Sequence, residues 1–405
     1  MRVWGLAVFI LAGAIATALA QENEPSSRAE LIEEQRRSRA SHLTPDVPDK
    51  VEQIFRRAQG VIERVFGVES GLRPVIGGMV TGGGFALGPE YYRPDLASGN
   101  IVFRASVRGT VKKYELMDVQ VTFPHLARDR AFVNVYGAYR NYPSLNYYGP
   151  GPTSVKTGRT DYRLEDTSFD GAAGVIPVRH LRVGVTGGYL LVNVGPGTDN
   201  RFASTDATYS PAAAPGIDRQ SNFLRGGPFF EYDYRDNPGD PHSGGNYLAS
   251  YIFYDDRELR TGTHRKLTAE AQQYLPFFNK KRVIALRAKT ELSYRRGNDV
   301  VPFYLQPALG GSDDLRGYRP FRFYDNNLFV MNAEYRWEVM TGFDMAVFGD
   351  AGKVFHRHSD FNFDLFQESA GFGLRFKSSS QVVMRWDVGF SREGFQVWIK
   401  FNNVF

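Results

Sequence analysis

Apolar and polar residues alternate one by one along most of the chain after residue 71. In the stretch 282–295, one face would carry Ile284, Leu286, Ala288, Leu292 and Tyr294, and the other Arg287, Lys289, Glu291 and Arg295. Successive side chains of an extended strand point to opposite faces, so this pattern predicts strands with one apolar and one charged face. Charged side chains are costly in the dry core of a two-sheet sandwich. The pattern therefore favours a barrel with lipid outside and water inside.

Sixteen such segments predict an all-β fold, a sixteen-stranded antiparallel transmembrane β-barrel. The predicted strands are 72–79, 82–92, 100–110, 114–123, 131–142, 160–171, 180–194, 222–235, 246–254, 266–275, 282–295, 327–339, 345–355, 368–377, 381–390 and 394–405. Long connections join strands five and six, seven and eight, eleven and twelve, and thirteen and fourteen, whereas the intervening connections are short. Outer-membrane barrels have long external loops and short periplasmic turns, so this alternation fits an even-stranded barrel.

The end of the chain continues the alternation as far as an aromatic carboxyl terminus. Phe395, Val397 and Ile399 would face lipid, with Gln396 and Lys400 on the wet side. The terminal Phe405 resembles the signal by which Gram-negative barrels are recognised by their assembly machinery. We therefore expect the protein in the cell outer membrane, with Phe405 as its assembly signal and the lipid bilayer as its surroundings.

The start of the chain predicts export. Arg2 precedes an apolar run at 6–15, and Ala18-Leu19-Ala20 supplies small residues before Gln21, so residues 1–20 are expected to be a signal peptide. No later run of about 18 uncharged apolar residues predicts a transmembrane helix.

Composition narrows the alternatives. The chain has no cysteine, although a secreted β-sandwich would be expected to carry disulfides, and its mean hydropathy is −0.36 despite 14% aromatic residues. A barrel accounts for this combination because its hydrophobicity is hidden in alternation. The net charge of +5 comes from basic residues interleaved with acidic ones, which argues against a nucleic-acid partner.

Residues 21–70 have a different pattern and predict a periplasmic helical segment, followed by the barrel at 71–405. Ser27 and Glu30 can form a capping box for a first helix. A second helix, 46–66, would be amphipathic, with the apolar stripe Val51, Ile54, Phe55, Ala58, Val61, Ile62, Val65 and Phe66. It could pack on the barrel, occupy its lumen or lie on the inner leaflet; the stripe alone does not choose among these surfaces.

Two motifs point to a family. The connection before the twelfth strand contains Leu315-Arg316-Gly317-Tyr318, and the thirteenth strand contains Phe348, Asp350 and Gly352 at alternate positions. Together they resemble the bacterial surface antigen barrel of the outer-membrane assembly-factor superfamily, to which BamA, TamA and FhaC belong. The resemblance implies that the loop folds into the lumen and that Arg316 pairs with Asp350.

Physical chemistry supports these implied roles. A guanidinium group in a narrowed lumen is partly desolvated and needs a carboxylate, and its planar fork makes the contact directional. We expect Glu334 and Arg336 to point inward beside this pair. Gly317 is expected to let the loop turn sharply, and Gly352 to let it approach the wall closely.

The resemblance covers about 72–405 and implies insertion or translocation of protein or lipid at the outer membrane, by a barrel that is expected to be monomeric. Client outer-membrane proteins or lipids would be its partners. Members usually carry POTRA modules before the barrel, and residues 21–70 are too few for one, so we expect a POTRA-less form. A passive pore or solute channel, and a structural surface antigen, remain the alternatives.

No motif predicts an enzyme, a cofactor or a metal. His356 and His358 could touch one metal ion, but the sequence offers no third ligand near them. A nucleophile elbow of the Gly-x-Ser-x-Gly type is absent from the sequence.

Overall fold

The computed structural model describes residues 69–401 apart from 78, 379 and 380, all within one of the two units into which the chain divides. The expected signal peptide, the amphipathic helix at 46–66 and Phe405 lie outside the described residues. No helix among the residues described is long and apolar enough to cross a membrane.

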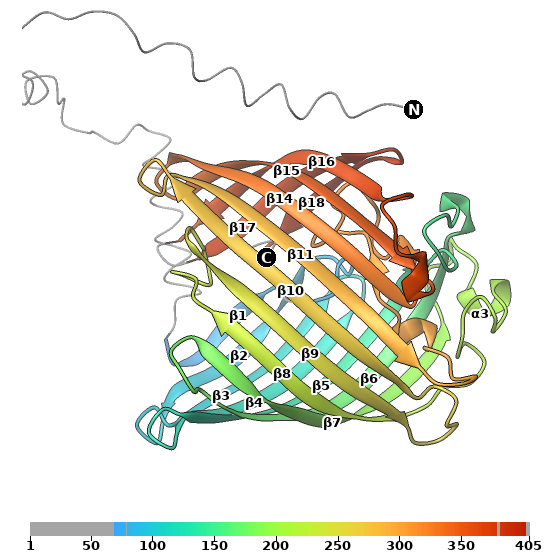
Figure 1. Ribbon diagram of the computed structural model, residues 1–405, viewed down its shortest axis with the longest axis horizontal. Helices are drawn as coiled ribbons and strands as arrows, with labels where there is room; N and C mark the ends of the chain where they lie inside the picture. The colour runs from blue at the N-terminus through green and yellow to red at the C-terminus, as the bar shows by residue number, and fades with distance from the viewer. Residues whose placement is uncertain (1–68, 78, 379–380, 402–405) are drawn as a thin grey trace, which may run out of the picture. The chain divides into compact units, whose positions relative to one another are not determined.

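Sixteen strands form one antiparallel sheet in sequence order (Figure 1). They are β1 (Gly71–Ile76), β2 (Ala86–Leu96), β3 (Ile101–Thr110), β4 (Glu115–Leu126), β5 (Ala131–Tyr147), β6 (Thr160–Val175), β7 (Leu181–Pro196), β8 (Phe223–Asp233), β9 (Gly244–Asp256), β10 (His264–Phe277), β11 (Arg282–Arg295), β14 (Asn327–Met340), β15 (Phe343–Phe355), β16 (Gln367–Lys377), β17 (Val382–Ser391) and β18 (Gly394–Lys400). Each predicted strand corresponds to one of these, so the all-β fold and the strand number are confirmed.

The first hairpin differs from its prediction. The pattern extended its two strands to 79 and from 82, whereas β1 ends at Ile76 and β2 begins at Ala86. Gly77, Gly82 and Gly84 between them have φ of +75°, +90° and +93°. A ladder strand needs extended φ, so these left-handed glycines end the pairing early.

The sheet curls, so that it has an outer and an inner face (Figure 1). On β11, Ile284 and Leu286 point outward and are 38% and 39% exposed, whereas Arg287 points inward and is 9% exposed. At the end of the chain Phe395, Val397 and Ile399 are likewise exposed. The predicted apolar outer face and charged inner face are present. We call the enclosed space the lumen.

Residues that flank the two edge strands of the sheet, β1 and β18, meet at a place that we call the seam. A Cβ atom built on Gly77 would lie 3.3 Å from Cβ of Phe401, and the rings of Phe85 and Phe401 pack edge to face with centroids 5.2 Å apart. No backbone ladder joins β1 to β18 in the described part of the chain. Among the residues described, the sheet thus lacks the closing ladder of backbone hydrogen bonds that the predicted barrel would have.

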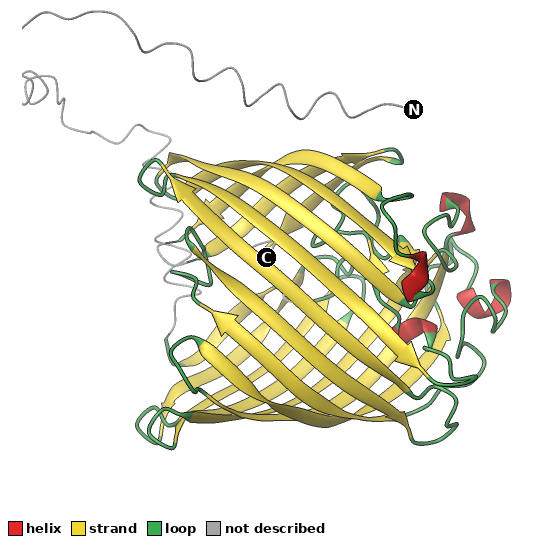
Figure 2. Ribbon diagram, viewed as in Figure 1, coloured by secondary structure: helices red, strands yellow, loops and turns green. Residues whose placement is uncertain are grey.

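The long connections gather at one end of the strands, together with the short helices (Figure 2). These helices are η1 (Lys156–Gly158), α3 (Thr205–Thr208), η2 (Phe303–Leu305) and η3 (His358–Asp360). The connection from 296 to 326, the inner loop, also contains the paired β12 (Ala308–Leu309) and β13 (Phe323–Tyr324). Phe303 and Tyr324 of the inner loop pack with Tyr147 and Tyr162 of the wall in a buried cluster. The inner loop thus occupies the lumen near that end.

Candidate functional site

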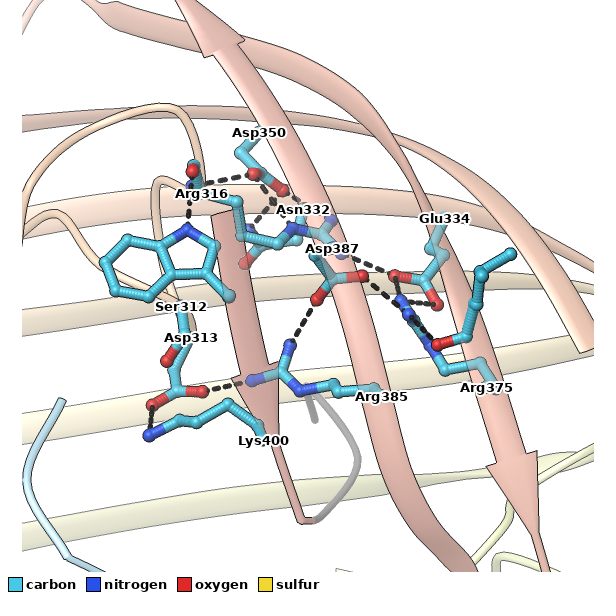
Figure 3. A network of polar contacts seen from close by, with 12 residues as sticks. Ser312, Asp313, Arg316, Asn332, Glu334, Asp350, Arg375, Arg385, Asp387 and Lys400 are labelled. Atoms are coloured by element: carbon cyan, nitrogen blue, oxygen red, sulfur yellow. Dashed lines mark hydrogen bonds and ion pairs between the residues drawn. The ribbon is translucent and has the colours of Figure 1, made fainter. Parts of the chain in front are cut away.

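Arg316 of the inner loop is fully buried against the wall strands β14 and β15 (Figure 3). Its Nη2 donates to Asp350 Oδ1 at 2.7 Å, its Nε donates to Asp350 Oδ2 at 3.1 Å, and its Nη1 donates to Glu334 Oε2 at 2.6 Å. The guanidinium carbon also lies 3.3 Å from the centroid of the Phe348 ring. The expected pair of Arg316 and Asp350 is therefore present, with Glu334 beside it.

The pair belongs to a longer chain of alternating charges (Figure 3). Glu334 also accepts hydrogen bonds from Arg336 at 2.8 Å and from Arg375 at 2.9 Å. Arg375 and Arg385 both donate to Asp387, at 2.5 and 3.0 Å. Each of these side chains is buried. Because each buried arginine of this ion network contacts a carboxylate, the network can be stable away from bulk water.

Leu315 and Tyr318, on either side of Arg316 and Gly317, anchor the loop by apolar packing. They lie in a buried cluster with Leu309, Phe323 and Val354. Apolar and ionic contacts therefore hold the same short segment, which fixes its position against β15.

Glycines allow the loop backbone to approach the wall backbone. A Cβ atom on Gly317 would lie 2.6 Å from the carbonyl oxygen of Phe390, and one on Gly389 would lie 2.4 Å from the carbonyl oxygen of Arg316. Gly317 also lies in the expected turn, because the backbone N–H of Tyr318 donates to the carbonyl oxygen of Leu315 at 3.0 Å. Gly317 therefore serves both the turn and the close approach to the wall.

The role expected of Gly352 agrees with its surroundings. A Cβ atom there would lie 3.0 Å from the carbonyl oxygen of Phe329 and 3.1 Å from Cδ1 of Leu309, a residue of the inner loop. The wall therefore accepts the loop closely at this point.

The inner loop also contacts both edges of the sheet, through a group of side chains that we call the seam clasp: Thr81, Ser312, Asp313, Trp398 and Lys400. Trp398 Nε1 donates to the carbonyl oxygen of Arg316 at 2.7 Å, and Lys400 Nζ lies 3.9 Å from Asp313 Oδ2. Thr81 Oγ1 donates to Asp313 Oδ2 at 3.1 Å and lies 3.2 Å from Ser312 Oγ. Asp313 is paired with Arg385 as well, at 2.5 Å. The ion pair of Asp313 with Arg385 thus connects the seam clasp to the ion network.

The motifs in the sequence did not indicate six further residues of the site: Asp313, Arg375, Arg385, Asp387, Gly389 and Trp398. A signal was present for some of them, because Arg385 and Asp387 are two residues apart on one strand and share its inward face. Nothing in one strand, however, indicates which charges of the other strands it will meet.

His356 and His358 have separate partners. His356 Nδ1 lies 3.1 Å from Asp325 Oδ1, and the ring of His358 packs on Tyr294. A separate group with suitable ligand atoms consists of Asp240, His242 and Asp344. The ammonium group of Lys377 pairs with both of its carboxylates, at 3.3 and 2.8 Å, and so supplies a cation there.

The comparisons with known proteins agree on the fold. Residues 104–397 match the family model of the Omp85 superfamily domain. The structure of BamA from Haemophilus ducreyi lacking POTRA domains 1–3 matches with a TM-score of 0.61 at 14% identity, over 80% of this chain and 69% of that one.

Two further structures match less closely. CdiB from Escherichia coli has a TM-score of 0.54 at 13% identity, and CdiB from Acinetobacter baumannii 0.51 at 10%. The match covers 81% of this chain in both cases, and 61% and 57% of theirs. No curated protein sequence matches the chain.

Proposed function

Because the chain belongs to the Omp85 superfamily, we propose that it resides in the outer membrane and inserts or translocates protein or lipid there. The exposed apolar face of the curled sheet supports a membrane location, since lipid can cover it. The charged inner face would then line an aqueous interior.

The seam is the observation that carries this proposal. Between neighbouring wall strands, such as β10 and β11, a continuous backbone ladder would have to break before the wall could part. Between β1 and β18, the contacts that would have to break among residues 69–77, 79–378 and 381–401 are side-chain contacts and the clasp. Parting there would expose two strand edges with free backbone groups. An extended client segment could add to such an edge, and a lipid could pass beside it.

The inner loop would stay bound to the wall while the seam parts. Its Arg316 is bound to Asp350 and Glu334 in a site without solvent exposure. The clasp contacts are weaker, because Asp313 is 43% and Lys400 21% exposed at the side chain. We therefore expect the seam to part while Arg316 stays on the wall.

A passive pore is the alternative to be tested against this. The buried cluster of Phe303, Tyr324, Tyr147 and Tyr162 fills part of the space that a solute would need. A conductance through the purified protein that survives locking of the seam, without client transfer, would favour the pore. A structural surface antigen would show neither activity.

The decisive experiment locks the seam. The chain has no cysteine, and the 3.3 Å between Cβ of Phe401 and a Cβ atom on Gly77 is near the separation that a disulfide requires. A variant with Gly77→Cys and Phe401→Cys, reconstituted in liposomes, would be assayed for folding of a urea-unfolded outer-membrane protein and for lipid exchange between leaflets. We expect oxidation to abolish the activity and reduction to restore it.

A second disulfide provides the matched control. Ala271 and Ala288 face each other across the ladder of β10 and β11, so Ala271→Cys with Ala288→Cys ties strands that are already joined. Oxidation of this pair should leave the activity unchanged. Full activity in the oxidised seam variant would refute the proposed opening.

A further inference from the structure

A polar cavity of about 580 Å³ lies beside the seam. The first hairpin lines it with Thr81 and Gly82, the last strand with Gln396 and Trp398, and the inner loop with Arg319. The cavity therefore touches both edges of the sheet and the loop that bridges them. Its volume is within the range of small-ligand sites in proteins.

Positive charge dominates the lining. The cations Lys112, Arg159, Arg201 and Arg319 are accompanied by the single carboxylate of Asp199. That carboxylate is already engaged, because Arg201 binds it through Nε at 2.8 Å and Nη2 at 2.7 Å. The hydrogen bond from Arg201 lowers the pKa of Asp199 to about 2, so the pair stays ionised at neutral pH. Asp199 also attracts Arg159 at longer range, but Lys112, Arg159 and Arg319 make no ion pair with a carboxylate among the described residues.

Arg159 is held in place by neutral groups. Its Nε and Nη2 donate to the same amide oxygen of Asn146, at 3.0 and 2.8 Å, and its guanidinium carbon lies 3.7 Å from the centroid of the Phe202 ring. Within the described residues, no carboxylate lies within ion-pair distance of Arg159 or Arg319. Lys112 likewise donates to a neutral group, the carbonyl oxygen of Gly82, at 3.1 Å.

The inward arginines of the wall behave differently. Arg104, Arg140, Arg225, Arg287, Arg375 and Arg385 each pair with at least one carboxylate. Burial lowers the pKa of Arg159, and the like charges of Arg319 and Arg201 add to this, against the opposing effect of Tyr148 and Asp199. Gathering four cations beside a single carboxylate is electrostatically unfavourable, and binding of an anion would relieve the repulsion among them.

We propose that this cavity binds a ligand through its phosphate group. A guanidinium group can donate two parallel hydrogen bonds to phosphate oxygens. A phosphate group can also interact with several cations at once. The phosphate could belong to a lipid headgroup that enters at the seam or to a soluble compound that enters between the loops. The first source rests on the proposed membrane function; the second does not.

Binding of two probes to the purified protein in detergent tests the proposal. One probe is inorganic pyrophosphate, measured by calorimetry, and the other is phosphatidylglycerol in mixed micelles, with phosphatidylcholine as the zwitterionic comparison. We expect Arg159→Gln to weaken binding by at least about tenfold, because it removes the charged fork. Arg159→Lys keeps the charge without the fork and should give an intermediate loss.

Arg163→Gln is the matched control. Arg163 lies four residues further along and is already paired with Glu165, at 3.0 Å, so its replacement should leave binding unchanged. Heat-modifiable migration on a gel shows that each variant is folded. Binding of both probes, or of either alone, supports the site and identifies the source.

Two results would overturn the proposal: binding of neither probe by the folded protein, and equal binding by the parent and Arg159→Gln. The assay contains no client, so it can fail while the seam-locking experiment succeeds. The two proposals are therefore tested separately.

Discussion

The inner loop is attached to the wall and to the seam by different kinds of contact. At the wall, Arg316 makes charge-assisted hydrogen bonds to Asp350 and Glu334 with no exposed side-chain surface on any of the three. At the seam, the ion pair of Lys400 and Asp313 is 3.9 Å long and partly exposed. A buried network is costly to break once formed, whereas exposed pairs contribute little. The same loop thus combines a firm attachment with one that can be released.

Among the variants considered, removal of the Arg316 side chain should have the largest effect on stability, because it breaks the attachment to the wall. Arg316→Ala leaves two carboxylates buried without their shared cation, and we expect the free energy of unfolding to fall by roughly 3–5 kcal/mol. Urea unfolding in detergent, followed by tryptophan fluorescence, measures the change.

An exposed arginine serves as the control for this variant. Arg257 pairs with Asp255 in a pair that is half exposed, so Arg257→Ala should have no resolvable effect. Equal stability of the Arg316→Ala variant and the parent would contradict a firm wall attachment.

A weaker disturbance of the same attachment comes from Gly389→Ala. The new methyl group would meet the carbonyl oxygen of Arg316 at 2.4 Å, and overpacking of this kind typically costs about 1–3 kcal/mol. We expect the loop to be displaced, so that a cysteine placed by Ser312→Cys reacts faster with a water-soluble thiol reagent.

Gly349→Ala is the comparison for that variant. Gly349 lies on β15, and a Cβ atom there would have no neighbour within 4 Å. Its thiol reaction should match the parent's. An unchanged reaction in both variants would mean that the close approach at Gly389 does not position the loop.

The smallest effect is expected at the seam. Trp398→Phe removes the indole N–H that donates to Arg316, a loss of about 0.5–1.5 kcal/mol for a single hydrogen bond. Global stability should change little, but the Gly77→Cys and Phe401→Cys pair should oxidise at a different rate because the edges move more freely.

The outward-facing Trp386 on β17 provides the control, since this residue is 45% exposed. Trp386→Phe should leave the oxidation rate unchanged. If Trp398→Phe also leaves it unchanged, the clasp does not govern the seam.

The wall could be predicted from the sequence because its signal is local. Each strand carries its own alternation, so β11 has the predicted bounds. The pairing of Arg316 with Asp350 came from a resemblance in the motifs. Gly349 and Gly389 show what local patterns lack. Both are glycines within strands, yet only Gly389 lies under the inner loop. That difference arises from the register and curl of the whole sheet.

The clasp also has a consequence for the order in which the molecule matures. Thr81 and Ser312 are separated by 231 positions, and Trp398 is 82 positions from Arg316. Contacts between distant segments form late, because the entropy of closing the intervening chain must be overcome first. The inner loop can therefore engage its wall strands before β18 has arrived, but the clasp needs both ends of the sheet. The clasp can therefore form only after both edge strands of the sheet are in place.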